Sequence, residues 1–279
     1  MPIKKDDTGK RWVEMELLVP GTPEEVWHAI ATGPGYTGWF VRSEIDARVG
    51  GSLTFDFGEG AVSHGEVTAW DPPRRVAYEE RDWADGAPPV ATEITVTGRD
   101  GGQSVVRMVH SLFTSSDEWD DQIESFEKGW PSFFAVLRLY LTHFSGRPAG
   151  SFFATAPAAG ESIPTWAALC DALGLAGATV GEERTSTLAH DPWTCVIERV
   201  YQDNHERYVL ARVTSPSPGI LFTGTNEAKG KLSDGEVNVG RRPGTNVSVA
   251  RYYYGDDASE RAATAEAAWR AWLKQTFGG

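Results

Sequence analysis

Cysteines and long apolar runs are both scarce in this sequence of 279 residues. Its two cysteines, Cys170 and Cys195, are too few for a disulfide framework or a cysteine-based zinc site, and they suit a reducing compartment. No run of 18 apolar residues occurs, which argues against a membrane-spanning helix. The first residues, Met1 to Asp7, lack the apolar segment of a signal peptide. We therefore expect a cytoplasmic protein.

Basic residues are also few relative to acidic ones. The chain has 26 Lys and Arg against 39 Asp and Glu, a net charge of −13. Residues 1–148 hold 14 basic against 24 acidic residues, a balance of −10, and the remainder accounts for −3. An acidic surface repels phosphate groups, so we expect neither nucleic acid nor an anionic membrane as a partner. The acidic cluster from Asp117 to Glu127 is interpreted as the start of a helix, with a docking patch as the alternative.

Motifs of the common catalytic classes are missing. The six histidines include no pair at metal-ligand spacing, and there is no GxSxG elbow, Walker loop or GxGxxG after a strand. We therefore predict no metal, no cofactor and no catalytic residue. Cys195 lies in an apolar strand and is interpreted as packing. A buried carboxylate acting as general base remains an alternative, and the candidates for it are Glu79, Glu80, Asp82 and Glu93.

The first half of the chain begins with a strand over 11–19 and a helix start at Thr22-Pro23-Glu24-Glu25, where Thr and Glu form a capping box. The break Gly33-Pro34-Gly35 precedes a second, shorter helical turn. Alternating residues separated by Gly and Pro turns then predict a meander of short strands. These strands are expected at 43–47, 52–57, 61–70, 75–83, 90–98 and 103–111.

One long helix is predicted over 118–144, because apolar residues recur there at steps of three and four. The stripe continues past Gly129 and Pro131. Pro131 should remove the hydrogen bond to the carbonyl of Glu127 and bend the helix, which would let it wrap a curved sheet. The stripe consists of Ile123, Phe126, Trp130, Phe133, Leu137, Leu141 and Phe144.

Several short motifs occur in a characteristic order over this half of the chain. They are Thr22-Pro23-Glu24-Glu25-Val26-Trp27, Trp39-Phe40, Gly50-Gly51-Ser52-Leu53-Thr54-Phe55, Gly65-Glu66-Val67, Asp71-Pro72-Pro73-Arg74-Arg75-Val76, Val109-His110-Ser111 and Gly129-Trp130-Pro131. Together they resemble the bacterial branch of the activator of heat-shock-protein-90 ATPase family, within the START/SRPBCC superfamily. The resemblance implies a helix-grip α+β domain, in which a long C-terminal helix closes a curved antiparallel sheet over an apolar cavity.

A boundary is expected within residues 146–160, which are rich in Gly, Pro, Ala and Ser, giving domains over 1–147 and 148–279. The second half repeats the order of the first. We predict a strand at 151–155, a helix at 164–173, and a closing Ala-rich helix at 260–277. Further strands are expected at 178–187, 194–203, 206–214, 218–224, 234–240 and 246–254. The second half is either a divergent copy of the helix-grip fold or an unrelated small α+β domain.

Residues on the converging elements of the first half are the candidate ligand contacts, unless they fill a solid core. They are Trp39, Phe40, Phe55, Phe57, Tyr78, Trp83, Arg107, His110, Phe126, Trp130, Phe133 and Phe134. The leading hypothesis is non-catalytic binding or carriage of a hydrophobic small molecule. The alternatives are a co-chaperone-like interaction module and a cyclase- or hydrolase-type enzyme of the same superfamily. A homo-oligomer is compatible with the sequence but not indicated by it.

Overall fold

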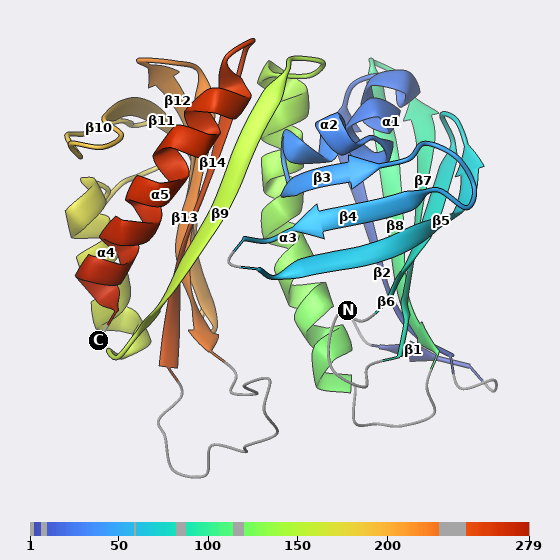
Figure 1. Ribbon diagram of the computed structural model, residues 1–279, viewed down its shortest axis with the longest axis horizontal. Helices are drawn as coiled ribbons and strands as arrows, with labels where there is room; N and C mark the ends of the chain where they lie inside the picture. The colour runs from blue at the N-terminus through green and yellow to red at the C-terminus, as the bar shows by residue number, and fades with distance from the viewer. Residues whose placement is uncertain are drawn as a thin grey trace. The chain divides into compact units, whose positions relative to one another are not determined.

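The computed structural model describes residues 3–6, 10–58, 60–81, 88–113, 120–228 and 244–278. Contacts between Cα atoms divide the chain into two units, Met1–Arg147 and Pro148–Gly279. Each unit contains one antiparallel sheet with helices packed against it (Figure 1). None of the helices in the described ranges is both long enough and apolar enough to cross a membrane.

The first unit has an eight-stranded sheet in which the order of strands is β1-β2-β8-β7-β6-β5-β4-β3. The six predicted meander strands are all present, as β3 to β8. Strand β2 pairs with β8 over its whole length, so the first long strand lies beside the last. The strands are β1 (Lys4–Lys5), β2 (Lys10–Pro20), β3 (Arg42–Ile45), β4 (Ser52–Asp56), β5 (Val62–Asp71), β6 (Arg75–Arg81), β7 (Val90–Arg99) and β8 (Gln103–Phe113).

Two short helices follow β2. Helix α1 (Pro23–Ala31) starts with the predicted capping box: the Thr22 backbone donates to Glu25 Oε2 at 2.7 Å, and the Glu25 backbone donates to Thr22 Oγ1 at 3.4 Å. Helix α2 (Gly33–Thr37) begins inside the predicted break, not after it. Gly35 makes this possible, because a Cβ there would lie 1.9 Å from the carbonyl oxygen of His28.

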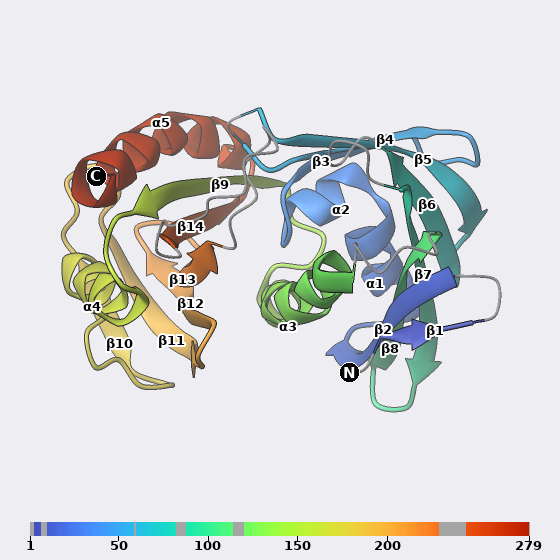
Figure 2. The same cartoon turned by 90° about the horizontal axis from the view of Figure 1, so that it is seen from below.

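The long helix is confirmed as α3 (Asp120–His143), and it continues through Pro131. It lies with α1 and α2 on the concave side of the curled sheet (Figure 2), where it contacts β2, β8 and α1. Its second half is buried through Val136, Leu137 and Tyr140, each at most 1% exposed. The first unit thus has the predicted helix-grip architecture.

In the described part of the second unit, six strands form a sheet in the order β10-β11-β12-β13-β14-β9, so β9 lies beside β14. The predicted strand at 234–240 lies outside the described residues. The other predicted elements are present, with β9 extending through most of the expected boundary segment. They are β9 (Ala149–Ala158), α4 (Ser162–Leu173), β10 (Glu183–Ser186), β11 (Trp193–Gln202), β12 (Glu206–Ser215), β13 (Gly219–Ala228), β14 (Gly244–Tyr254) and α5 (Ala258–Phe277).

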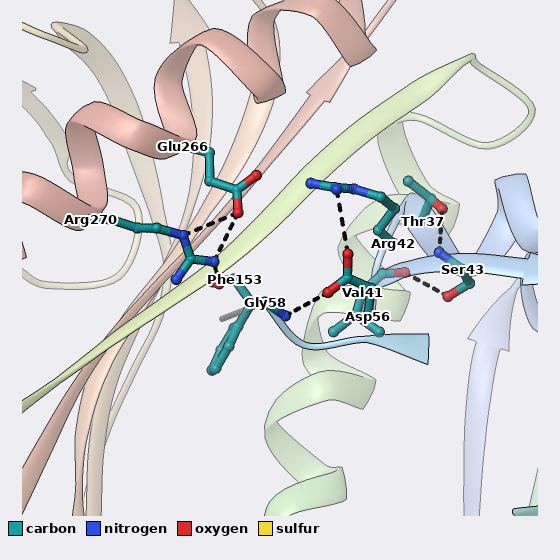
Figure 3. A network of polar contacts seen from close by, with 9 residues as sticks. All are labelled: Thr37, Val41, Arg42, Ser43, Asp56, Gly58, Phe153, Glu266 and Arg270. Carbon is teal, nitrogen blue, oxygen red and sulfur yellow. Dashed lines mark hydrogen bonds and ion pairs between the residues drawn. The ribbon is translucent and has the colours of Figure 1, made fainter. Parts of the chain in front are cut away.

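Helices α4 and α5 contribute to a single core with the second sheet. Trp193 and Trp269 are both at most 1% exposed, and Trp166 of α4 packs in the same cluster. Arg270 of α5 donates a hydrogen bond to the carbonyl of Phe153 on β9 at 3.0 Å, and its guanidinium is held in place by an ion pair with Glu266 of the same helix at 2.8 Å (Figure 3). Large indoles therefore fill the space between helix and sheet in this unit.

Candidate functional site

A cavity of about 440 Å³ lies inside the first unit, between α3 and the concave face of the sheet. Strands β4 to β8 contribute residues to its lining, and α3 contributes Gly129, Trp130 and Phe133. Seven of the fourteen lining residues have aromatic side chains. These are Phe40, Phe55, Phe57, Tyr78, His110, Trp130 and Phe133.

Phe40 is at the centre of this aromatic group. Its ring stacks on Trp130 with centroids 5.1 Å apart, and it meets Phe133 edge to face at 4.9 Å. Phe55 and Phe57 approach the same ring at 5.6 Å, both edge to face. Offset stacking and edge-to-face contacts are the favoured arrangements of aromatic rings. The rings therefore support one another around the cavity as well as lining it.

The rim of the cavity is shaped by the turn after β4. Asp56 accepts hydrogen bonds from the backbone of Gly58 at 2.8 Å and from Arg42 at 3.4 Å (Figure 3). The backbone of Ala61 then donates to the carbonyl of Gly58 at 2.9 Å. These bonds return the chain to β5, so that Gly60 and Ala61 line the cavity next to Phe57.

Polar groups reach the cavity from β5, β6 and β8. Ser63 donates a hydrogen bond to Glu80 Oε1 at 2.5 Å. The hydroxyl oxygens of Tyr36 and Tyr78 lie 3.3 Å apart, and Thr92 Oγ1 lies 2.8 Å from His110 Nδ1. The cavity is thus an aromatic chamber with a carboxyl, a phenol and an imidazole in its lining.

Burial changes the proton affinity of these groups. It lowers the pKa of His110 to about 4, so the imidazole is neutral at neutral pH. Burial also raises the pKa of the Glu80 carboxyl, against an opposing effect of the hydrogen bond from Ser63. The pKa of Tyr78 lies well above its usual value, mainly because of burial. An ionised Glu80 in this chamber therefore needs a partner that compensates its charge.

Seven of the twelve predicted contacts line the cavity together: Phe40, Phe55, Phe57, Tyr78, His110, Trp130 and Phe133. Trp39 and Phe134 are buried behind them. Trp39 donates to the carbonyl of Ala29 at 2.8 Å, and Phe134 stacks on Trp130 at 5.4 Å. The position of Trp83 and the side chain of Phe126 lie outside the described residues, as do Asp82 and the side chains of the predicted acidic cluster.

Arg107, also predicted as a contact, is not among the residues that line the cavity. It lies on β8 three residues before His110, and alternation directs the two side chains to opposite faces. Arg107 forms an ion pair with Glu14 of β2 at 2.7 Å. Among the candidate carboxylates, Glu80 lines the cavity, whereas Glu79 and Glu93 form ion pairs with Arg81 and Arg75.

The cavity is also lined by three residues that were not among the predicted contacts, Val62, Ser63 and Val90. The period of two along β6 places Glu80 on the same face as Tyr78, which is the signal that singles it out. The same period of two places Val90 on one face of β7 with Thr92 and Ile94.

Residues 20–142 match the family model described as Activator of Hsp90 ATPase homolog 1-like protein. The matched segment runs from the end of β2 almost to the end of α3, so it contains the whole cavity lining. The first unit is therefore similar to this family over residues 20–142. We refer to it as the AHSA1-like domain.

Solved structures with similar folds include CalU16 from Micromonospora echinospora, which is 18% identical with a TM-score of 0.41, over 50% of this chain and 83% of that chain. MLL2253 from Mesorhizobium loti is 22% identical with a TM-score of 0.44, over 48% and 99%. DynU16, from the dynemicin biosynthetic locus, is 17% identical with a TM-score of 0.42, over 96% and 98%. A comparison with curated proteins gave no match.

The second unit differs from the AHSA1-like domain in the character of its cavity. This cavity has about 390 Å³ and lies at the start of α5, where its lining is largely polar and charged. On one side is Arg251, which is 2% exposed and forms an ion pair with Asp191 at 2.8 Å. Asp191 also accepts hydrogen bonds from Tyr253 at 3.1 Å and from the Trp269 indole at 2.9 Å.

The two cysteines are both in the second unit and both buried. Burial raises the pKa of Cys195 to about 11 and that of Cys170 to about 12. Both thiols are therefore protonated at neutral pH, which agrees with a packing role. No group of three or more potential metal ligands is found in the described part of the chain.

Proposed function

We propose that the AHSA1-like domain binds and carries a hydrophobic small molecule in the cavity beneath α3, without changing it chemically. The observation that carries this proposal is the cavity itself, about 440 Å³ and lined mainly by aromatic and other apolar residues. That volume is within the range typical of small-molecule sites. The family supports the same reading, because helix-grip proteins bind ligands in cavities of this kind.

Packing energetics favour a binding role over a structural one. A void inside a domain forfeits dispersion contacts for every side chain around it, so interiors are normally filled. In the second unit, Trp193 and Trp269 fill the region between sheet and helix. The AHSA1-like domain instead keeps the space open beside Phe40 and Trp130. Selection for a ligand explains why this packing is not completed.

The second unit supports a related proposal about the whole chain. Its strand order and its two helix positions repeat those of the AHSA1-like domain, with the first strand beside the last. We infer that it is a divergent copy of the helix-grip fold that has lost the apolar cavity. The two buried, reduced cysteines further support a cytoplasmic location.

A titration with the neutral fluorophore N-phenyl-1-naphthylamine tests the binding proposal. Ala61 lies at the rim, lines the cavity and is exposed, so Ala61→Trp should obstruct entry without disturbing the core. We expect saturable binding by the full chain and at least a tenfold weaker affinity for this variant. Val49→Trp, at a position 60% exposed and outside the lining, is the matched control and should bind as the unmodified chain does.

Absence of saturable binding, or equal affinity in the Ala61→Trp variant and its control, would contradict the proposal.

The family name makes interaction with Hsp90 the second candidate, favoured by the match over residues 20–142. A pull-down with the host chaperone, using the Ala61→Trp variant in parallel, separates the two. A chaperone contact would survive obstruction of the cavity, whereas ligand carriage would not.

A further inference from the structure

Among the described residues that line the cavity, Glu80 contributes a carboxyl to a mainly apolar and aromatic surface. Glu80 follows Tyr78 by two positions on β6, so both side chains face inward. Its carboxyl accepts a hydrogen bond from Ser63 at 2.5 Å. Among the described residues, no lysine or arginine forms an ion pair with it. A carboxylate held in an apolar enclosure without a cation is unfavourable, which marks this position as a functional contact.

The surrounding rings are suited to positive charge. The face of an aromatic ring carries negative potential and attracts ammonium and guanidinium groups, with tryptophan the strongest. Phe40, Phe133 and Trp130 approach one another within 6.1 Å, centroid to centroid, next to the open space. Several aromatic rings and one carboxyl are the combination that recognises organic cations.

The net charge of the whole domain also favours a cationic ligand. Residues 1–147 contain 14 Lys and Arg against 24 Asp and Glu, a balance of −10. Such a field attracts cations and repels anions as they approach. His110, the basic group in the lining, has its pKa lowered to about 4 by burial and does not compete as a cation at neutral pH.

We propose that the occupant of the cavity is an organic cation, an amine or quaternary ammonium on an apolar body, with its charged end against Glu80. This rests on the proposed function and specifies its ligand. Glu80 is the specificity-determining residue, and Ser63 positions its carboxyl. Burial raises the pKa of Glu80, and a cation beside it restores the charged form.

A pair of probes of the same shape tests the inference. Trimethyl(2-naphthylmethyl)ammonium and 2-neopentylnaphthalene differ in the replacement of N⁺ by carbon. Calorimetric titration of the full chain should show the cation binding at least about tenfold more tightly, a difference of about 1.4 kcal/mol. Glu80→Gln should abolish this preference while leaving the neutral probe within about twofold. Ser63→Ala should reduce the preference with the carboxyl still present.

Glu79→Gln is the matched control, because Glu79 is the preceding residue on β6, faces outward and pairs with Arg81. It should leave the preference unchanged, and near-ultraviolet circular dichroism checks that each variant is folded. Equal binding of the two probes, or equal effects of Glu79→Gln and Glu80→Gln, overturns the cation inference while the binding proposal stands. Failure of both probes to bind overturns both.

Discussion

Replacement of Asp191 by Ala should destabilise the second unit far more than any surface change. Asp191 is 12% exposed and compensates Arg251, which is 2% exposed, through hydrogen bonds of 2.8 and 3.3 Å. It also accepts from Tyr253 and from Trp269. The substitution leaves a buried guanidinium without its counter-charge and an indole N–H without its acceptor.

The expected loss is about 3–5 kcal/mol in the free energy of unfolding of this unit, as found when one partner of a buried ion pair is removed. A domain of ordinary stability has about 5–15 kcal/mol in total, so the loss is a large part of it. Urea unfolding gives the global value. Hydrogen exchange measured on peptides from β14 and α5 assigns the effect to the second unit.

Two further variants serve as controls for this prediction. Glu198→Ala removes a partner of Arg212 in a pair whose side chains are 28% and 29% exposed, and it should cost less than about 1 kcal/mol. The double variant Asp191→Leu with Arg251→Met removes both charges, so it should recover the part of the loss that comes from the unpaired guanidinium. The Trp269 and Tyr253 donors still lack their acceptor, so recovery should be partial. A loss below about 1 kcal/mol for Asp191→Ala, or no recovery in the double variant, would refute the reasoning.

Two other predictions concern the AHSA1-like domain. Because burial lowers the pKa of His110 from 6.5 to about 4, this residue stabilises the fold above pH 6.5, and the contribution is lost as the pH falls toward 4. In the His110→Gln variant, the free energy of unfolding should therefore fall less between pH 6.5 and pH 4, by up to about 3 kcal/mol. Urea titrations at each pH measure this fall, and an unchanged fall contradicts the prediction. A Cβ at Gly129 meets nothing within 4 Å, so Gly129→Ala in α3 should raise the unfolding free energy by about 0.5–1 kcal/mol; a loss of stability would show that the site is not open.

The elements of this protein could be predicted from the sequence because each depends on local rules. The capping box at Thr22, the alternation around Tyr78 and the apolar stripe of α3 are determined by neighbouring residues. Helix α2 begins earlier than predicted, because Gly33-Pro34-Gly35 is typical of a break between helices. Thr32 caps a helix there instead, accepting from the Gly35 backbone at 3.0 Å.

The site could be predicted only in part. The aromatic residues around Phe40 follow from the converging elements, but an open cavity and a solid core require the same residue types. Which one forms depends on small differences in packing that composition does not express. The Asp191 network was not foreseen, because its partner Arg251 is 60 positions away and no local pattern links a loop carboxylate to a distant strand.

The adjacency of first and last strands constrains how each unit is made. Strand β2 pairs with β8, and the Glu14–Arg107 bond joins residues 93 positions apart. Likewise β9 pairs with β14, which is synthesised last before α5. In a growing chain, the edge of β2 that pairs with β8, and likewise the edge of β9 that pairs with β14, therefore stays unpaired until nearly the whole unit has left the ribosome. Contacts of such long range slow folding, and the closing helix can pack only after this pairing is complete.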